Sequence, residues 1–420
     1  MKIRTLKSGL RVITKEVLGT EAVTTLVMCG AGSRYETKDI SGLSHFLEHM
    51  FFKGGKRYPD SKSVAESIDS IGGEFNAFTG KEYVGYYVTT PKEKYLQAFD
   101  VLSDMLINSK FEEREIEKER GVILEEFNMY EDMPMYKVRD EFETQIFGDN
   151  PLGWEIIGTK KVINSIQRED FLKYLKKQYK PKNMVVCVAG PLPEAEVVKN
   201  VEKYFQFDGK GEFDKPYIFE DYTKKKIALI NKKTEQAHLV YGMPAFGSED
   251  KHKKYILKLI AVVLGGNMSS RMFISIREER GLCYYIKTSF VPYVKAGYLA
   301  TFAGVDLKRV EEAVTAITEE YKKIAKGDIK ESELKNAQEY LKGKLTLGLE
   351  DTESLAQFYA EQLIESGEIC DLKDLKQEID SVTLKEVNDL AKKLFKSEEL
   401  RLCLIGPYKD EKQFLSKMIF

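Results

Sequence analysis

Two histidines and one glutamate, spaced as on a single helix face, carry the clearest chemical signal in this sequence. His45 and His49 are two of only four histidines in the chain. Residues four apart lie on one face of a helix, so both imidazoles point the same way, as two zinc ligands from one helix must. Glu48 reaches the same side and would take a proton from a metal-bound water. The order of these residues inverts the common His-Glu-x-x-His helix of zinc peptidases.

The segment around these residues is expected to form a buried helix. Its apolar residues cover nearly every side: Leu43, Phe46, Leu47, Met50 and Phe51. Candidate N-cap residues precede it and a glycine pair follows it: Asp39, Ser41, Ser44 and Gly54–Gly55. Buried polar groups need partners, and two core histidines paired with carboxylates would also satisfy them. Metal binding is the preferred interpretation, because unpaired buried charge is so costly.

A third protein ligand is needed to complete a zinc site. The five cysteines form no Cys-x-x-Cys pair, so the acidic segment 111–130, with seven glutamates, is the better source. Most of these glutamates should be solvated surface charge, and helical phase shows which of them fall on the apolar face instead. Glu126 and Glu119 fall on an apolar stripe, whereas Glu125 lies about 100° away on the polar side. The residues of that stripe are Val122, Ile123, Phe127, Met129 and Tyr130. One of the two stripe glutamates is the expected ligand and the other its supporting partner.

The motif and its spacing resemble those of the M16 (pitrilysin-type, inverzincin) zinc metallopeptidases. Their signature is His-x-x-Glu-His, then about 76 residues, then a ligating glutamate. Here 76 residues separate His49 from Glu126, and Glu119 matches a second family glutamate seven residues before the ligand. The resemblance is strongest to the small bacterial processing-protease and mitochondrial processing peptidase-like branch. It implies one Zn²⁺ per chain, held by His45, His49 and Glu126, with Glu48 as general base and Glu119 supporting the ligands.

Length and composition fit an enzyme of two or more domains. The chain has 420 residues, a net charge of −2 and 31% charged residues without a long block of one sign. Nucleic acid and anionic membranes are therefore not the expected partners. The beginning of the chain lacks an apolar signal core, and no apolar run is long enough to span a membrane. Five scattered cysteines fit a reducing compartment, so a cytoplasmic location is expected.

The sequence contains an internal duplication. Val185–Pro191 near the end of the first half matches Arg401–Pro407 near the end of the second, at an offset of 216. A strand, a helix and a Gly-Gly pair recur near the start of each half, with Leu26 and Leu239 offset by 213. Segment 207–216 is rich in turn formers and marks the predicted boundary. The predicted domains are residues 1–210, which carry the zinc motif, and residues 211–420, which lack it.

The predicted fold class is α+β. Short strands alternate with amphipathic helices, and pairs such as 73–79 with 83–89 read as antiparallel hairpins. The family resemblance implies two homologous domains, each a mainly antiparallel sheet packed by helices, as in the mitochondrial processing peptidase-like metallohydrolase fold.

Two further segments are candidates for substrate binding. Asn76, Ala77 and Phe78 resemble the edge strand to which family members add their substrate, although Phe78 could equally be a core residue. Arg277 and Tyr284, seven residues apart, match an Arg and a Tyr of active members that hydrogen-bond the substrate near the cleaved bond. Without the resemblance, a glycine turn that leads into a surface helix would be an equally good interpretation of this second segment.

The sequence therefore predicts a zinc-dependent metalloendopeptidase. The resemblance implies that it hydrolyses peptides or unfolded segments inside a chamber formed by paired chains, here a homodimer because one chain carries both sets of residues. A non-catalytic peptide-binding or scaffold subunit of the same family is the alternative. A zinc hydrolase for non-peptide substrates is disfavoured by the strand-like segment at Asn76.

Overall fold

The computed structural model describes residues 1–209 and 211–420, which form two compact units. Unit 1 is built from three segments: Met1–Asn128, Trp154–Ile218 and Leu347–Cys370. Unit 2 is built from three others: Met129–Gly153, Phe219–Thr346 and Asp371–Phe420. One passage between the units, at Ile218, is close to the boundary predicted at residue 210. A single cut does not describe the units, however, because residues 129–153 and 347–370 are exchanged between the two halves of the sequence.

The sheet of unit 1 has six strands in the order β1-β2-β6-β3-β5-β4. They span β1 (Lys2–Thr5), β2 (Arg11–Glu16), β3 (Ala22–Cys29), β4 (Glu74–Thr79), β5 (Val84–Pro91) and β6 (Met184–Gly190). All neighbouring pairs are antiparallel except β2 with β6. β3 and β6 are almost entirely buried, which explains their nearly continuous apolar sequences. β4 lies at the edge of this sheet.

The sheet of unit 2 repeats this arrangement with five strands, in the order β7-β11-β8-β10-β9. They span β7 (Ile227–Asn231), β8 (Ala237–Ala245), β9 (Cys283–Tyr293), β10 (Ala296–Val305) and β11 (Arg401–Gly406). Its parallel pair is β7 with β11, which corresponds to β2 with β6. The matching strand orders agree with the internal duplication, and the predicted α+β class with mainly antiparallel sheets is confirmed.

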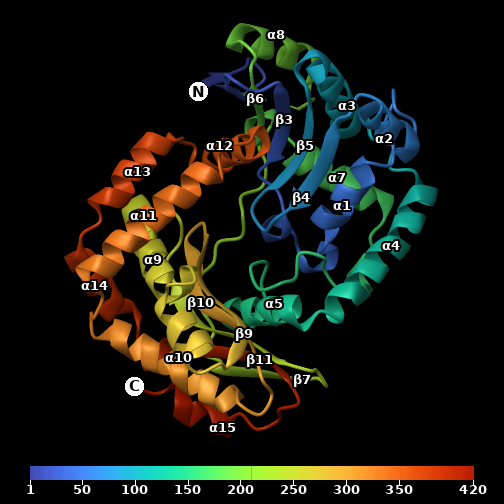
Figure 1. The fold of residues 1–420 in the computed structure, drawn as a ribbon. Coiled ribbons are helices and arrows are strands. Elements are labelled where there is room, and N and C mark those ends of the chain that lie inside the picture. Colours follow the sequence, from blue (N-terminus) through green and yellow to red (C-terminus); the bar gives the residue numbers. More distant parts are fainter. Residues whose placement is uncertain (210) are drawn as a thin grey trace. The chain divides into compact units, whose positions relative to one another are not determined.

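Helices complete each unit (Figure 1). Unit 1 contains α1 (Leu43–Phe51), α2 (Ser61–Asp69), α3 (Tyr95–Asn108), α6 (Lys160–Ile163), α7 (Arg168–Gln178), α8 (Glu194–Tyr204), α12 (Thr352–Ser366) and most of α4 (Glu113–Glu131). Unit 2 contains α5 (Pro134–Phe147), α9 (Lys251–Ala261), α10 (Val310–Ala325), α13 (Leu372–Ser381), α14 (Leu384–Leu394), α15 (Lys412–Leu415) and nearly all of α11 (Glu331–Leu347). Among the described residues, no helix combines the length and the apolar character needed to span a membrane.

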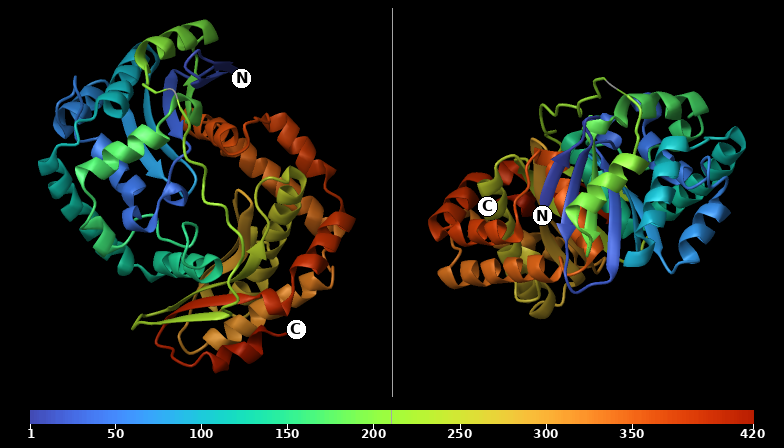
Figure 2. Two further views of the ribbon diagram at one scale, coloured as in Figure 1. Left: turned by 180° about the vertical axis from the view of Figure 1, so that it is seen from behind. Right: turned by 90° about the horizontal axis from the view of Figure 1, so that it is seen from above.

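Each sheet is covered by a helix from the other half of the sequence. Figures 1 and 2 show α12, in orange, beside the blue strands of unit 1. Its residues Ala356, Tyr359 and Ala360 are buried against Leu26 and Cys187 of that sheet. In unit 2, α5 packs on β8 and β11 in the same way. This exchange explains why the units do not follow one cut, and it means that residues 1–210 alone would lack the helix that covers their sheet.

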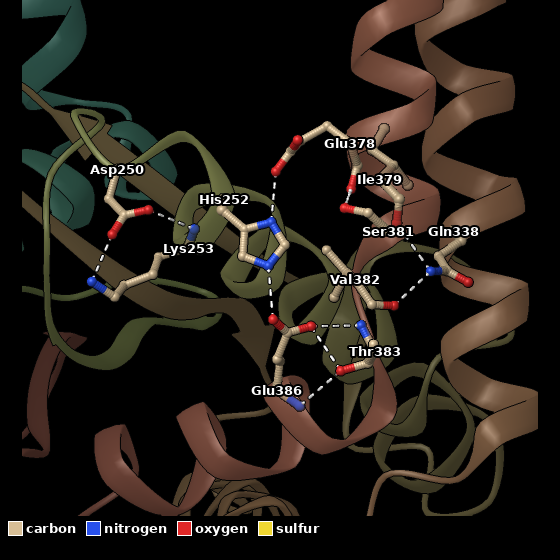
Figure 3. Close-up of polar contacts among 10 residues, drawn as sticks. All are labelled: Asp250, His252, Lys253, Gln338, Glu378, Ile379, Ser381, Val382, Thr383 and Glu386. Carbon is tan, nitrogen blue, oxygen red and sulfur yellow. Dashed lines mark hydrogen bonds and ion pairs between the residues drawn. The ribbon is translucent and has the colours of Figure 1, made fainter.

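A histidine held between two glutamates connects three helices of unit 2 (Figure 3). Nδ1 of His252 in α9 lies 2.6 Å from Glu378 Oε1 in α13, and Nε2 lies 3.0 Å from Glu386 Oε1 in α14. Both ring nitrogens can donate only when the imidazole is protonated. The hydrogen bonds to Glu378 and then Glu386 accordingly raise the pKa of His252.

We expect this histidine to make the stability of unit 2 depend on pH. A folded-state pKa raised above the ordinary value of about 6.5 contributes stability that is fully present below that pH. The contribution is lost as the pH rises through the folded-state pKa. Because all three side chains are over a third exposed, it should not exceed about 1 kcal/mol. Urea unfolding of His252→Gln should show a larger loss at pH 6 than at pH 9, and equal losses would contradict this assignment.

Candidate metal centre

The helix α1 carries the two histidines, and it is capped in a way that the sequence did not indicate. Its N-cap is Gly42, in the left-handed conformation at φ 99°, and no side chain of its own caps it. Asp39, Ser41 and Ser44 therefore do not serve as the predicted caps. The buried carboxylate of Glu36 accepts instead, from the backbone N–H of Gly42 at 2.8 Å and of Ser44 at 2.6 Å. These bonds satisfy two of the N–H groups that every helix leaves open at its start.

Three ligand atoms converge at the buried side of α1. Nε2 of His45 lies 3.6 Å, and Nε2 of His49 lies 3.4 Å, from Oε2 of Glu126 in α4. Ligands bound at about 2.0–2.2 Å around a tetrahedral zinc are spaced by about 3.3–3.6 Å. One atom from each residue lies within 4.8 Å of the others, and this is the one such group of three among the described residues. Two imidazoles and one carboxylate are a donor set of catalytic zinc sites, so the residues fit the ion.

A carboxylate and an ammonium group fix the orientation of His49. Its Nδ1 lies 2.8 Å from Oε1 of Glu119, and Oε2 of Glu119 lies 2.5 Å from Nζ of Lys53. Glu119 is 4% exposed. A carboxylate on Nδ1 leaves Nε2 for the metal and increases the basicity of the ring. Within the described residues, the buried Nδ1 of His45 has no such partner.

The pKa values of these groups show strong mutual attraction. The imidazoles of His45 and His49 hold the pKa of Glu126 well below its usual range. Burial acts to lower the pKa of His49, but the carboxylates of Glu119 and Glu126 outweigh burial and raise it to about 9. For Glu119, burial acts to raise the pKa, yet His49 and Lys53 hold it below the ordinary value. The cluster therefore favours ionised carboxylates, which suits a cation.

Glu48 lies on the same helix, within reach of the edge strand. Its Oε2 accepts a hydrogen bond of 2.5 Å from the hydroxyl of Thr79, the last residue of β4. Phe75, four residues earlier on the same face of β4, packs against Phe52 at the end of α1. The helix α1 and the edge strand β4 are therefore in direct contact, and Glu48 takes part in that contact.

Helix α4 largely follows the predicted phase. Glu119 is buried, Glu126 is half-buried and Glu125 is exposed. Two residues assigned to the apolar stripe depart from it, because Val122 is 48% exposed and Met129 is 44% exposed. Periodicity thus separated the adjacent glutamates, but it overstated how far the stripe is covered.

The three residues proposed to bind substrate in unit 1 lie on the edge strand β4. Asn76 and Phe78 project from one face of β4, and Phe75, Ala77 and Thr79 project from the other. The ring of Phe78 covers Gly85 of the paired strand and packs edge-to-face with Tyr83, in the cluster that includes α12. Phe78 is thus partly buried against this core cluster, and its contact with substrate stays a prediction.

Arg277 and Tyr284 lie together in unit 2. Arg277 is in a π-helical turn, Phe273–Glu278, and Tyr284 is at the start of β9. The guanidinium carbon lies 4.6 Å from the ring centroid of Phe273 and 5.8 Å from that of Tyr284. Tyr284 is 76% exposed, so its hydroxyl is open to a partner.

Three supporting residues were not found from the sequence. Lys53 follows His49 by four residues, so helical spacing could have indicated it. Thr79 ends the strand that was already a candidate, and only the placement of β4 beside α1 shows its contact with Glu48. Glu36 reaches α1 from a preceding loop, for which no periodic pattern exists.

We expect Glu36 to support metal binding through the position of α1. In Glu36 the two backbone N–H groups are accepted by different oxygens, and glutamine replaces one of these oxygens with an NH2 group, which cannot accept. Glu36→Gln should weaken zinc binding by about tenfold or more, as changes to partners of metal ligands do. Competition with a chelator below the unfolding temperature measures this affinity. Asp60→Asn, at the cap of α2, is the control, and equal zinc affinity in both variants would limit Glu36 to a stability role.

Comparison with known proteins gives matches over nearly the whole chain. The family model described as insulinase (peptidase family M16) matches residues 11–160, and that of the peptidase M16 inactive domain matches residues 165–341. The chain is 37% identical to YmxG of Bacillus subtilis, described as an uncharacterized zinc protease, over 97% of this chain and 98% of that protein.

Solved structures agree on the fold. A protease from Helicobacter pylori has a TM-score of 0.89 at 21% identity, covering 97% of this chain and 99% of that one. A chain of Complex III2 from Candida albicans has a TM-score of 0.84 at 17% identity, covering all of both chains. At these identities the likeness concerns the fold alone, and the same fold is found in a protease and in a chain of Complex III2.

Proposed function

Because the chain belongs to the peptidase M16 family, we propose that it is a zinc-dependent metalloendopeptidase with one zinc ion per chain. The convergence of His45, His49 and Glu126, with Glu48 beside them, carries this proposal. Relatives named as zinc proteases support it. A purely structural subunit would need neither the three candidate ligands nor the candidate base, and this chain has all four residues.

The residues of unit 1 divide the chemistry of peptide hydrolysis among them. A zinc ion held here would polarise the peptide carbonyl and the attacking water. Glu48 accepts the proton of that water and then delivers it to the leaving amine. Thr79 donates to one oxygen of Glu48 and so restrains the carboxylate, which leaves the other oxygen to accept the proton. Glu119 and Lys53 keep the ring of His49 in its binding orientation.

We further propose that the substrate is an extended peptide or an unfolded polypeptide segment. β4 is an edge strand in contact with α1, so a peptide added to this edge would lie beside Glu48. Strand addition requires free backbone N–H and C=O groups on the substrate, and in a folded protein most of these groups are already hydrogen-bonded to one another. By resemblance, two chains would pair to enclose the substrate. No disulfide joins cysteines in the part of the chain that the structure describes, and we propose a cytoplasmic site of action, where the thiols would stay reduced.

A quenched fluorescent peptide tests the function directly. Cleavage that stops with a chelator and returns with zinc is the expected result. The same cleavage sequence placed inside a stable folded domain should be spared until that domain is denatured. Zinc binding without cleavage of any peptide would instead favour the non-catalytic scaffold alternative.

Arg277 and Tyr284 should contribute to substrate use without contributing to metal binding. Arg277→Ala and Tyr284→Phe remove donors suited to a peptide carbonyl, so each should lower kcat/KM by about tenfold or more. Zinc content should stay unchanged. Arg280→Ala is the matched control, since that arginine pairs with Glu319 at 2.9 Å. Unchanged kcat/KM in both variants would remove the pair from the mechanism.

A further inference from the structure

A cavity of about 460 Å³ lies in unit 2 beside the edge strand β9. Its apolar lining comes from Met268, Phe273 and Ile286 and from the ring of Tyr340. The hydroxyl of Tyr340 donates to the backbone carbonyl of Gly266 at 3.0 Å, which ties α11 to the glycine turn on the other side of the cavity. The volume is sufficient for one or more peptide side chains.

Two lysines are the charged residues of this lining, Lys287 from β9 and Lys344 from α11. Across the described ranges, neither forms an ion pair, although Lys344 lies over the ring of Tyr340 at 5.9 Å. Two residues before Lys344 on the same helix, Lys342 is bound by Glu339 at 2.7 Å and Asp380 at 2.6 Å. The cavity therefore combines an apolar surface with two ammonium groups that have no counter-ion of their own.

The cavity adjoins the residues to which the proposed function assigns peptide contacts. Phe273 lines it, and the guanidinium of Arg277 lies over the same ring at 4.6 Å. Arg277 in turn lies near Tyr284. A peptide held by Arg277 and Tyr284 would thus have a neighbouring side chain within reach of the cavity.

We propose that this cavity binds an acidic side chain of the peptide substrate, with its carboxylate between Lys287 and Lys344 and its methylene groups on Phe273. The proposal rests on the proposed function and narrows it to peptides that carry a glutamate or aspartate. Opposite charge supplies the missing counter-ion, and the apolar lining suits the stem of the side chain.

Binding is measured first, because it does not depend on turnover. In a Glu48→Gln background, fluorescence anisotropy gives the Kd of a peptide series in which one glutamate moves along an otherwise uncharged sequence, each paired with its glutamine version. At one position the glutamate peptide should bind about three- to tenfold more tightly, the range for two partly exposed ion pairs. Lys287→Gln and Lys344→Gln should each reduce this ratio, and the double variant should abolish it. Raising the salt to about 0.5 M should also diminish it.

Lys335→Gln is the matched control, because it removes the same charge from an exposed position of α11 outside the cavity. It should leave the ratio unchanged. A ratio of one at every position, or a preference that survives the double variant, overturns the proposal. A preference seen only for a free C-terminal carboxylate, and lost in the C-terminal amide, also overturns it. Wild-type cleavage with zinc but no glutamate preference rejects this inference alone, whereas absence of any cleavage rejects the proposed function.

Discussion

Replacing Glu48 with glutamine should leave zinc bound and reduce peptide cleavage by at least a few hundredfold. Both histidines and Glu126 remain, so the metal site keeps its donors. The amide cannot accept the proton of the attacking water, and loss of a general base typically costs about 10²–10⁴ in rate. Metal content by elemental analysis and turnover of a quenched peptide measure the two effects separately.

Glu66→Gln is a suitable control for this experiment, since that glutamate is exposed on the helix α2 and pairs with Lys62 at 3.4 Å. It should retain both zinc and activity. Retained activity in Glu48→Gln would remove Glu48 from the mechanism and would move the search for a base to another residue.

Replacing Glu126 with glutamine should strip the zinc or weaken its binding severely. A neutral amide is a poor ligand for this cation, and the two imidazoles would remain without their anionic partner. Glu125→Gln, one residue earlier on the exposed side of α4, should be close to neutral. Glu119→Gln should fall between them, with about 10–100-fold weaker metal binding, because Glu119 acts through His49. Elemental analysis and chelator competition on the three variants give the order of their zinc affinities.

The comparison of Glu125 with Glu126 distinguishes the loss of a metal ligand from the loss of a charge. Both variants lose the same charge at nearly the same place in the chain. Zinc loss in Glu125→Gln with normal zinc in Glu126→Gln would contradict both the helical phase and the observed geometry.

The sequence was most informative where one helix repeats a regular pattern. Four-residue spacing placed His45 and His49 together, and helical phase separated Glu126 from Glu125. Both inferences depend only on local geometry, which one helix determines by itself. The predicted α+β class likewise followed from local strand and turn signals.

The features that the sequence did not reveal depend on contacts between distant segments. Glu36 caps α1 from outside the helix, where ordinary capping rules look for a residue adjacent to it. Helix α12 covers the sheet of unit 1 from a position more than 300 residues after β2. Its apolar face shows that it is buried, but amphipathicity does not specify the partner. For the same reason, a boundary chosen from turn residues found one passage between the units and missed the exchanged segments.

The exchange of α5 and α12 has a consequence for how this protein is made. Synthesis runs from the N-terminus at about 5–20 residues per second. All three candidate metal ligands have therefore left the ribosome well before α12, which begins at Thr352. During that interval the face of the nascent sheet around Leu26 and Cys187 has no cover. Unit 1 can complete its core only near the end of translation, when α12 becomes available. A chain that terminates before α12 would expose this apolar face of the sheet to chaperones and would not form a complete unit 1.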